Sequence, residues 1–452
     1  MARQRIETDV VFVGGGSAGL SGAVRAAELG LRAVVLEKLG SCGGDALMAA
    51  GFWVAAETPY QKAQGIEDSQ EAFYRYLVDY SAHRCQPELI RVLVERAAAN
   101  LAWLEAQGLS FSPQVQAHGV TTVPRVHQNE GMGARYVNVM KGRAEELGVD
   151  LRLQTGAKEL LVEGGAVVGV VAEGPGGEEW ELRARGVVLT TGGFGKSPEL
   201  VARHSPYRKR HAMVCAGWAR GDGIRLAEQA GAEIADTQVA IGYKAEMPGT
   251  SALTMRSFYL ILATDYVVVN RQGRRFVDES VWNAHFAHAL NTQTDATGFV
   301  ILDEAMRTGN PFHDFSKEIG SGKVRRGDSF AELAGAAGLP VEAFSETLER
   351  YNRFARAGRD EAFGKAAASL KPLESPPYYA VEIVPLVLNT VGGPRIDAGA
   401  RALRPDGTPI AGLYAAGNNA AGFYDNYPTT GAGLQISSIF GQVAAEQVKA
   451  SS

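Results

Sequence analysis

Three glycines near the start of the chain, Gly14, Gly16 and Gly19, have the spacing Gly-x-Gly-x-x-Gly. They stand between an apolar run, residues 9–13, and an alanine-rich stretch, residues 20–29, which predicts a buried strand followed by a helix. The first glycine permits a tight turn, the second lets the backbone approach a pyrophosphate, and the third lets the helix pack on the strand. Free N–H groups at the helix N-terminus favour phosphate. The spacing therefore predicts a dinucleotide site.

A carboxylate follows at the end of the next apolar run. Residues 32–36 predict a second buried strand, and Glu37, 18 residues after Gly19, ends it where a carboxylate can accept both hydroxyls of a ribose. Two further glycine-rich turns lie at residues 190–195 and 415–419. Because only one fingerprint is present, we expect one long dinucleotide touched by several loops, which fits FAD better than NAD.

The composition excludes several classes of protein. Hydrophobic residues make up 46% and charged residues 21% of the chain, which is ordinary for a soluble globular protein. The net charge of −5 gives no reason to expect a nucleic acid or an anionic membrane as partner. Cys42, Cys85 and Cys215 are far apart, so we expect a reducing compartment, no disulfide framework and no metal site. Without a signal-peptide core or a run able to span a bilayer, the protein is expected to be cytoplasmic.

The 452 residues exceed what one hydrophobic core usually supports, so we expect two domains. Residues 1–235 begin with the β-α-β unit and continue through helices to a segment of alternating polarity, residues 158–185, which predicts a β-meander. Residues 236–376 mix strands with Pro and Gly breaks, and we place a second domain there. Residues 377–452 return to strand-rich, glycine-rich segments. The helical patterns cover residues 68–108, 135–147, 329–337 and 340–357.

Nearly the whole chain carries motifs that belong together in one superfamily. They are residues 13–19, 37–38, 43–51, 191–193, 221–223, 269–279, 349–352, 390–393 and 412–417. They resemble the fumarate reductase/succinate dehydrogenase flavoprotein superfamily, above all its soluble branch of 3-ketosteroid Δ1-dehydrogenases, flavocytochrome-type fumarate reductases and tricarballylate-type dehydrogenases. The resemblance implies an α/β fold, α+β overall. Residues 1–235 and 377–452 would form a Rossmann-type FAD-binding domain with a β-meander, and residues 236–376 an inserted α+β capping domain over the flavin.

The resemblance also implies the reaction and the cofactor contacts. In this superfamily a hydride passes between flavin N5 and a carbon of a C–C bond next to an electron-withdrawing group. Succinate dehydrogenases hold FAD covalently through a histidine at the position of Gly44, so we expect non-covalent FAD. Without a haem motif, the chain is not expected to be a flavocytochrome. The residues expected to contact FAD are Gly14, Gly16, Ser17, Ala18, Gly19, Glu37, Lys38, Gly43, Gly44, Asp45, Gly51, Ala157, Thr191, Gly192, Asp222, Gly417, Asn418, Gly433, Leu434 and Ile436.

Three departures from the fumarate reductase pattern concern the substrate. Asn389 stands where those enzymes have a carboxylate-binding histidine. Glu279 is followed by Ser-Val-Trp-Asn-Ala, without the proton-donating arginine, and the last glycine-rich loop offers Tyr427 in place of a second arginine. The loss of these groups argues against a fumarate-type mechanism on dicarboxylates.

The loop that carries Tyr427 in place of the second arginine indicates another substrate. Residues 427–431, Tyr-Pro-Thr-Thr-Gly, resemble the Tyr-Pro-x-x-Gly loop of ketosteroid Δ1-dehydrogenases, in which the tyrosine hydroxyl and the glycine N–H bind the substrate ketone. Such a pair is an oxyanion hole, and removing one donor of this kind costs roughly 3–4 kcal/mol. Tyr427 and Gly431 therefore predict a desaturase that acts on a ketone, cyclic and able to bear a carboxylate. The partners would be this small molecule and an unidentified electron acceptor.

The base that takes the α-proton is left open. The ketosteroid enzymes use a tyrosine at the position of Trp282 or Asn283. His285 and His288 follow closely and are candidates for the base, since histidine titrates near neutral pH. Tyr259 is the other candidate. Trp282 and Asn389 are expected near the substrate, and Arg125 could hold a substrate carboxylate. The alternatives are a dehydrogenase of tricarballylate-like acids, an ene-reductase working in the reverse direction, and a flavin-binding protein without turnover.

Overall fold

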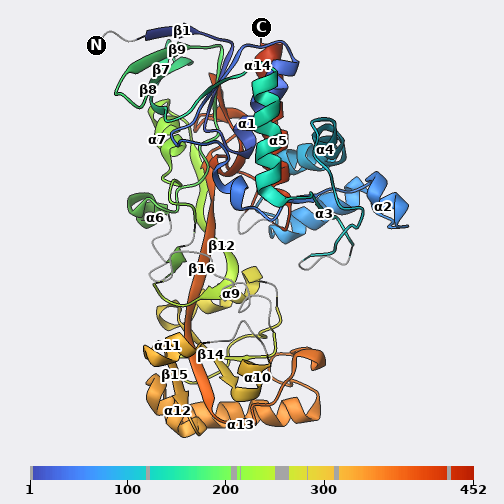
Figure 1. Ribbon diagram of the computed structural model, residues 1–452, viewed down its shortest axis with the longest axis vertical. Helices are drawn as coiled ribbons and strands as arrows, with labels where there is room; N and C mark the ends of the chain where they lie inside the picture. Colours follow the sequence, from blue (N-terminus) through green and yellow to red (C-terminus); the bar gives the residue numbers. More distant parts are fainter. Residues whose placement is uncertain are drawn as a thin grey trace. The chain divides into compact units, whose positions relative to one another are not determined.

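The structure is a computed structural model that describes residues 4–118, 123–204, 211–213, 215–249, 264–281, 283–309, 315–424 and 429–451 (Figure 1). The chain divides into two compact units. Unit 1 comprises Met1–His204, Ala216–Val239 and Thr390–Ser452, and unit 2 comprises Ser205–Cys215 and Ala240–Asn389. The α/β fold predicted from the sequence is confirmed, and its nucleotide-binding part lies in unit 1.

The central sheet of unit 1 has the order β17-β18-β10-β2-β3-β6. β2, β3 and β10 are buried along their whole length, which is why they are uninterrupted apolar runs in the sequence. All neighbours are parallel except β17 and β18. The sheet thus joins strands from the beginning and the end of the chain. Its strands are β2 (Val10–Val13), β3 (Ala33–Leu36), β6 (Asp150–Arg152), β10 (Gly186–Leu189), β17 (Arg401–Leu403) and β18 (Pro409–Ala415).

Two helices, α1 (Ser17–Glu28) and α14 (Ala432–Ala450), cross closely beside this sheet (Figure 1). A Cβ on Gly22 would stand 2.7 Å from the Gly441 carbonyl oxygen, and a Cβ on Gly441 would stand 2.2 Å from the Ala18 carbonyl oxygen. Only glycine lets the two helix backbones approach each other so closely. As a result, the N-terminus of α14 lies near the turn that precedes α1.

The other elements of unit 1 surround this core. The predicted meander is present as a four-stranded sheet of order β1-β9-β8-β7, and β8 packs against β10 and β18 (Figure 1). The helical pattern over residues 68–108 divides into α3 and α4, and Pro87 is the first residue of α4. The bounds are β1 (Gln4–Glu7), β4 (Phe52–Val54), α2 (Pro59–Ala63), α3 (Gln70–Tyr80), α4 (Pro87–Ala106), β5 (Val126–Gln128), α5 (Met132–Glu146), β7 (Gly156–Glu163), β8 (Ala166–Glu173), β9 (Glu179–Arg183), α6 (Pro198–His204) and α7 (Asp222–Gln229).

Unit 2 is built on one long strand, β16 (Tyr378–Pro394), whose last residues belong to unit 1. β16 pairs with β11, β12, β14 and β15. It begins at Tyr378, directly after the boundary expected between residues 376 and 377, and it continues past Asn389, where unit 2 ends. The remaining elements are β11 (Ala212–Met213), β12 (Ile234–Glu246), β13 (Val267–Asn270), α9 (Asn283–Asn291), β14 (Gly298–Asp303), α10 (Glu304–Thr308), α11 (Ser316–Gly320), β15 (Val324–Gly327), α12 (Phe330–Ala337) and α13 (Val341–Ala357).

A buried group of four charged residues, which we call the Arg275 cluster, stabilises unit 2. It consists of Arg275, Glu279, Asp360 and Lys365. The Arg275 guanidinium donates to Glu279 at 2.8 and 3.0 Å and to Asp360 at 2.9 and 3.2 Å. Lys365 Nζ lies 3.3 Å from Glu279 Oε2 and donates to the Tyr266 carbonyl oxygen at 2.6 Å. The two positive and two negative charges balance inside the unit.

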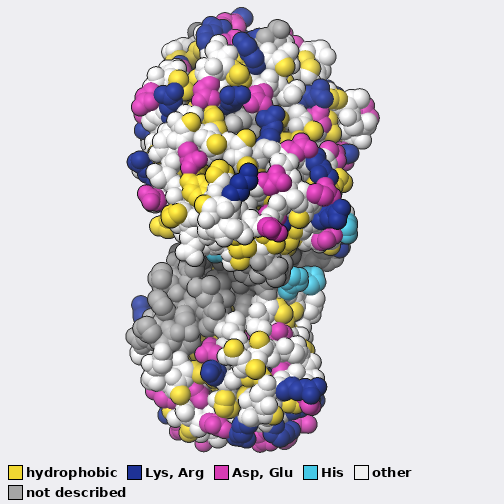
Figure 2. Space-filling model, turned by 90° about the vertical axis from the view of Figure 1, so that its right-hand side faces the viewer, with side chains coloured by type: hydrophobic (Ala, Val, Ile, Leu, Met, Phe, Trp, Pro, Cys, Tyr) yellow, Lys and Arg dark blue, Asp and Glu magenta, His cyan; other side chains and the backbone are white. Residues whose placement is uncertain are grey.

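The surface seen in Figure 2 carries acidic and basic side chains interspersed with each other. Among the described residues on that face, the Lys and Arg side chains form no continuous patch of the kind that follows a nucleic-acid backbone. This distribution agrees with the small net charge of −5.

Candidate cofactor and substrate site

The turn between β2 and α1 leaves room for a phosphate. Gly14 adopts φ +114°, and a Cβ there would stand 2.6 Å from the Thr190 carbonyl oxygen. A Cβ on Gly19 would stand 2.0 Å from the Gly14 carbonyl oxygen, so α1 begins directly against the turn. Over Gly16 the nearest described atom is the Gly43 carbonyl oxygen, 3.9 Å from a Cβ position. The backbone is therefore open at the one glycine that the fingerprint assigns to the pyrophosphate.

Glu37 is fixed beside this turn by two backbone donors. Its carboxylate accepts the Gly15 N–H at 2.9 Å through Oε2 and the Leu39 N–H at 2.8 Å through Oε1. Burial raises the pKa of Glu37, while the N–H groups and the neighbouring Lys38 offset part of this effect. The carboxylate stands at the carboxyl end of β3, where a ribose can reach it.

Lys38 connects the end of β3 to the start of α7. Its Nζ donates to Asp222 Oδ2 at 2.5 Å and to the Trp218 carbonyl oxygen at 2.9 Å. The Gly223 N–H in turn donates to Thr191 Oγ1 at 3.0 Å. Three residues predicted to contact the cofactor, Lys38, Thr191 and Asp222, are thus brought to one edge of the sheet from distant parts of the chain.

The segment of residues 43–51 lies against the same turn. The Gly43 N–H donates to the Gly15 carbonyl oxygen at 2.8 Å. Asp45 Oδ1 is buried and has no hydrogen-bond partner among the described residues. Gly51 adopts φ +73°, and a Cβ there would stand 2.6 Å from Asn129 Oδ1, which requires a glycine. Ala157 lies in β7, two residues after Thr155, whose N–H donates to the Glu37 carbonyl oxygen at 2.9 Å.

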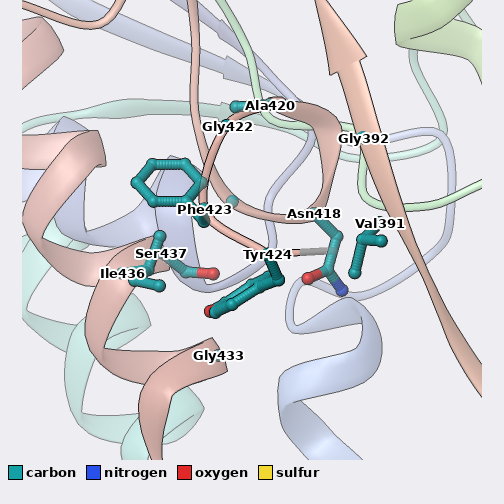
Figure 3. A pocket seen from close by; sticks show the side chains of 11 residues that line it. Val391, Gly392, Asn418, Ala420, Gly422, Phe423, Tyr424, Gly433, Ile436 and Ser437 are labelled. Carbon is teal, nitrogen blue, oxygen red and sulfur yellow. The ribbon is translucent and has the colours of Figure 1, made fainter. Parts of the chain in front are cut away.

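A pocket at the carboxyl end of β18 collects four of the residues predicted for the cofactor (Figure 3). These are Gly417, Asn418, Gly433 and Ile436, from the turn after β18 and from the start of α14. The Tyr424 ring extends toward Ile436 and Ser437, and the Asn418 side chain lies beside Val391 (Figure 3). The sequence did not predict the other lining residues, which are Val391, Gly392, Ala420, Gly422, Phe423, Tyr424 and Ser437.

Gly431 stands directly before α14, two residues from the pocket. It adopts φ +87°, and a Cβ there would stand 2.9 Å from the backbone of Trp53 and Val54 in β4. The Gly431 N–H donates to no acceptor among the described residues. A glycine is required at this position, and its N–H is available to a ligand. Thr429, in the same loop, accepts or donates a hydrogen bond of 2.8 Å with the Tyr76 hydroxyl.

Arg125 takes part in a second buried group, which we call the Arg125 cluster: Gln61, Asp68, Tyr76 and Arg125. Arg125 Nε and Nη2 donate to the Asp68 carboxylate at 2.7 and 2.6 Å, and both side chains are at most 3% exposed. Gln61 Nε2 donates to Asp68 Oδ2 at 3.0 Å. The guanidinium carbon lies 5.5 Å from the Tyr76 ring centroid. These contacts give Arg125 a structural role, and binding of a substrate carboxylate by Arg125 stays a prediction.

The remaining predicted substrate residues are distributed over both units. His285 is exposed on α9 beside the buried Phe286. Asn389 is half-buried in β16, at the end of unit 2. Tyr259, Trp282 and Tyr427 lie outside the described residues. The catalytic roles of Tyr427, Gly431, His285 and Tyr259 therefore stay predictions.

The residues of unit 1 fit FAD. The backbone is open over Gly16, the Glu37 carboxylate is fixed at the end of β3, and a pocket lies beside the start of α14. Ser17 directs its hydroxyl to Tyr136 at 2.9 Å, Ala18 packs near Gly417, and Leu434 packs on the core. Ala18 and Leu434 thus contribute packing around the site, and the backbone of α1 is left to face a phosphate.

Comparisons with known proteins agree with this site. The FAD binding domain family matches residues 9–434. The NADH:fumarate oxidoreductase of Klebsiella pneumoniae is 31% identical over 97% of this chain. The chain belongs to the fumarate reductase/succinate dehydrogenase flavoprotein superfamily. It spans about half of that relative, 47% of its length.

Ketosteroid-type members of this flavoprotein superfamily are also similar to the chain. The 3-oxosteroid 1-dehydrogenase of Mycobacterium tuberculosis is 28% identical, and the match covers 97% of this chain and 98% of the relative. The crystal structure of a 3-ketosteroid-Δ4-(5α)-dehydrogenase from Rhodococcus jostii, in complex with 4-androstene-3,17-dione, superposes with a TM-score of 0.81 at 26% identity. That superposition covers 99% of this chain and 100% of the other.

These findings confirm the predicted superfamily, the FAD-dependent oxidoreductase class and action on C–C bonds. FAD as cofactor is confirmed, whereas its non-covalent attachment stays a prediction. Among the described residues, no helix is long and apolar enough to cross a membrane. The cytoplasmic location stays a prediction.

Proposed function

We propose that this flavoprotein desaturates a ketone between its α and β carbons, and that the ketone is cyclic and able to bear a carboxylate. The observation that supports the proposal is the Gly431 N–H, which precedes a 19-residue helix and has no acceptor among the described residues. A donor fixed in this way, at the positive end of a helix, suits an oxygen on which negative charge develops.

The Gly431 N–H and the Tyr427 hydroxyl would hold the carbonyl oxygen of the substrate. A base removes the α-proton while the two donors stabilise the charge on the oxygen. The β-carbon then releases a hydride, so the substrate loses two electrons and gains a C=C bond. Bound FAD supplies the hydride acceptor at N5. His285 and Tyr259 are the residues to test as the base.

Anaerobic mixing with a panel of ketones tests this function. Cyclohexanone-type or 3-keto substrates should bleach the oxidised flavin band, and the Tyr427→Phe variant should bleach far more slowly at unchanged FAD content. Bleaching by tricarboxylates and by no ketone would instead assign the protein to acids of the tricarballylate type. Equal loss of bleaching and of FAD in Tyr427→Phe would give Tyr427 a structural role.

Reduction of the same kind of C=C bond is a second candidate function. It is favoured by the 31% identity to a protein named NADH:fumarate oxidoreductase. Two anaerobic reactions distinguish the two directions: chemically reduced protein is mixed with an enone, and oxidised protein is mixed in parallel with the saturated ketone. Fast reoxidation by the enone, together with slow bleaching by the ketone, would favour the reductase.

Two further properties belong to this proposal. FAD is held without a covalent bond, because Gly44 stands where the resemblance would require a histidine. Precipitation with acid should therefore release all the flavin into the supernatant. Residues 236–376 form the capping domain that the resemblance implies, and an electron acceptor from outside the chain completes the cycle.

A further inference from the structure

Trp218 is held at the edge of the nucleotide site by contacts on both sides. Its carbonyl oxygen accepts Lys38 Nζ at 2.9 Å and the Arg220 N–H at 2.8 Å. Lys38 also binds Asp222, the first residue of α7. The turn that carries Trp218 is thus tied to the end of β3, directly after Glu37.

The indole of Trp218 faces the glycines of the site. A Cβ on Gly44 would lie 3.8 Å from Trp218 Nε1 and 3.8 Å from the Gly16 Cα. Gly16 is the glycine over which the turn is open. The indole N–H and the pyrophosphate-binding backbone therefore both lie close to the Cβ position of one residue, Gly44.

Two buried polar atoms meet here without a partner. Neither Trp218 Nε1 nor Asp45 Oδ1 makes a hydrogen bond with the described residues. Burial raises the pKa of Asp45, and the Trp218 side chain, which comes close enough to act as a hydrogen-bond donor to the carboxylate, offsets part of this effect, although no hydrogen bond of normal geometry joins the two. A buried donor or acceptor left unsatisfied costs about 1–3 kcal/mol. One donor and one acceptor side by side therefore suit a ligand that carries both kinds of group.

We propose that the Trp218 indole N–H and the Asp45 carboxylate bind FAD between them, Trp218 donating to an oxygen of the dinucleotide and Asp45 accepting from a sugar hydroxyl. A phosphate oxygen and a neighbouring sugar hydroxyl of the same dinucleotide satisfy the hydrogen-bonding needs of both side chains at once. Trp218 becomes a cofactor-binding residue in addition to those of the glycine turn, and the assignment holds whichever substrate the protein uses.

Titration of the apo-protein with FAD tests the assignment without any substrate. Trp218→Phe keeps an aromatic ring and removes the N–H, so FAD should bind about five- to tenfold more weakly, as expected for one lost hydrogen bond. The chain has five tryptophans, and the part of their fluorescence that FAD quenches should fall in this variant. Trp218→His, which restores a ring N–H, should recover part of the affinity.

Trp180→Phe is the matched control. Trp180 lies in β9, its ring stacks on Arg152, and it is not among the nearest atoms to the Cβ positions of Gly14, Gly16, Gly19 or Gly44. This variant should bind FAD as the unchanged protein does. If Trp218→Phe binds FAD within twofold of the unchanged protein and loses no quenching, Trp218 and Asp45 only bind each other, and the proposal is overturned. If Trp218→Phe cannot be prepared folded, weaker binding by Asp45→Ala, which removes the acceptor, with unchanged binding by Trp180→Phe, carries the same test.

Discussion

Each unit of this protein buries an arginine with a carboxylate, but the two groups are connected differently. In the Arg275 cluster the four charges satisfy each other and nearby backbone, so the cluster ends inside unit 2. In the Arg125 cluster the arginine lies near the Tyr76 ring, and the Tyr76 hydroxyl binds Thr429, two residues before Gly431. The first group stabilises the fold, whereas the second also supports the loop that we propose to bind the substrate carbonyl.

Breaking the Arg275 cluster should have the largest effect. Glu279→Gln removes one negative charge from a buried group that contains two cations, and loss of one partner of a buried ion pair costs about 3–5 kcal/mol. Urea unfolding followed by circular dichroism measures this loss of stability. The flavin of unit 1 should remain bound at urea concentrations that unfold unit 2.

Glu374→Gln is the control for this variant. Its ion pair with Arg356 is exposed, the two side chains being 49% and 59% accessible. Exposed pairs contribute about 0–1 kcal/mol, so unfolding should shift little. A shift for Glu279→Gln no larger than this would contradict a structural role for the Arg275 cluster.

Asp68→Asn changes the corresponding carboxylate of the Arg125 cluster. An amide oxygen can still accept from Arg125, so the loss should be that of a charged hydrogen bond, about 1.5–3 kcal/mol. The prediction specific to this cluster is that substrate-dependent bleaching slows in the folded variant, with FAD content unchanged. If bleaching is as fast as in the unchanged protein, the Arg125 cluster is as purely structural as the Arg275 cluster.

Gly431→Ala tests the loop to which the Arg125 cluster is connected through Tyr76 and Thr429. The left-handed backbone, φ +87°, costs an alanine about 1–2 kcal/mol, and its Cβ would meet the backbone of Trp53 and Val54 at 2.9 Å. The loop must shift, so bleaching by ketones should fall by more than the loss of stability explains. Gly142→Ala is the control, since Gly142 lies inside α5, does not line the pocket, and a Cβ there meets no described atom within 4 Å. If both substitutions slow bleaching equally, the role proposed for Gly431 is contradicted.

The sequence predicted the parts of the site that depend on local pattern. Gly14, Gly16 and Gly19 with Glu37 could be assigned because turn geometry, burial and spacing all act within one β-α-β unit. The partners of Arg125 could not, because Asp68 is 57 residues away and only the fold brings the two together. The sequence therefore left Arg125 free for a substrate.

Trp218 was missed for the same reason. The nearby motif of residues 221–223 indicates the cofactor but not the Trp218 side chain, whose position depends on a hydrogen bond from Lys38 at the end of β3. The approach of α14 to α1, which depends on Gly22 and Gly441, likewise involves two glycines with no local signature. Motifs thus identify the residues that touch the cofactor through the backbone, while side chains recruited from afar become visible only in the fold.

Tyr76→Phe is the smallest change and separates the two clusters most sharply. It leaves the ring beside Arg125 and removes only the hydrogen bond to Thr429, which should lower stability by about 0.5–1.5 kcal/mol. Because burial raises the pKa of Tyr76, the hydroxyl is neutral at working pH, and the effect should not depend on pH between 6 and 8, roughly the range below tyrosine ionisation. Stopped-flow bleaching should show a lower rate at saturating substrate.

Tyr74→Phe makes the same chemical change on the same helix and provides the comparison. The Tyr74 ring stacks on Arg91, and its hydroxyl makes no hydrogen bond with the described residues, so stability and rate should both stay unchanged. Thr429→Ser, which keeps a hydroxyl for Tyr76, should retain more of the rate than Thr429→Val. If Tyr76→Phe and Tyr74→Phe behave alike, the Arg125 cluster stops at Tyr76, and the loop before α14 is held by its glycine and its contacts with β4 alone.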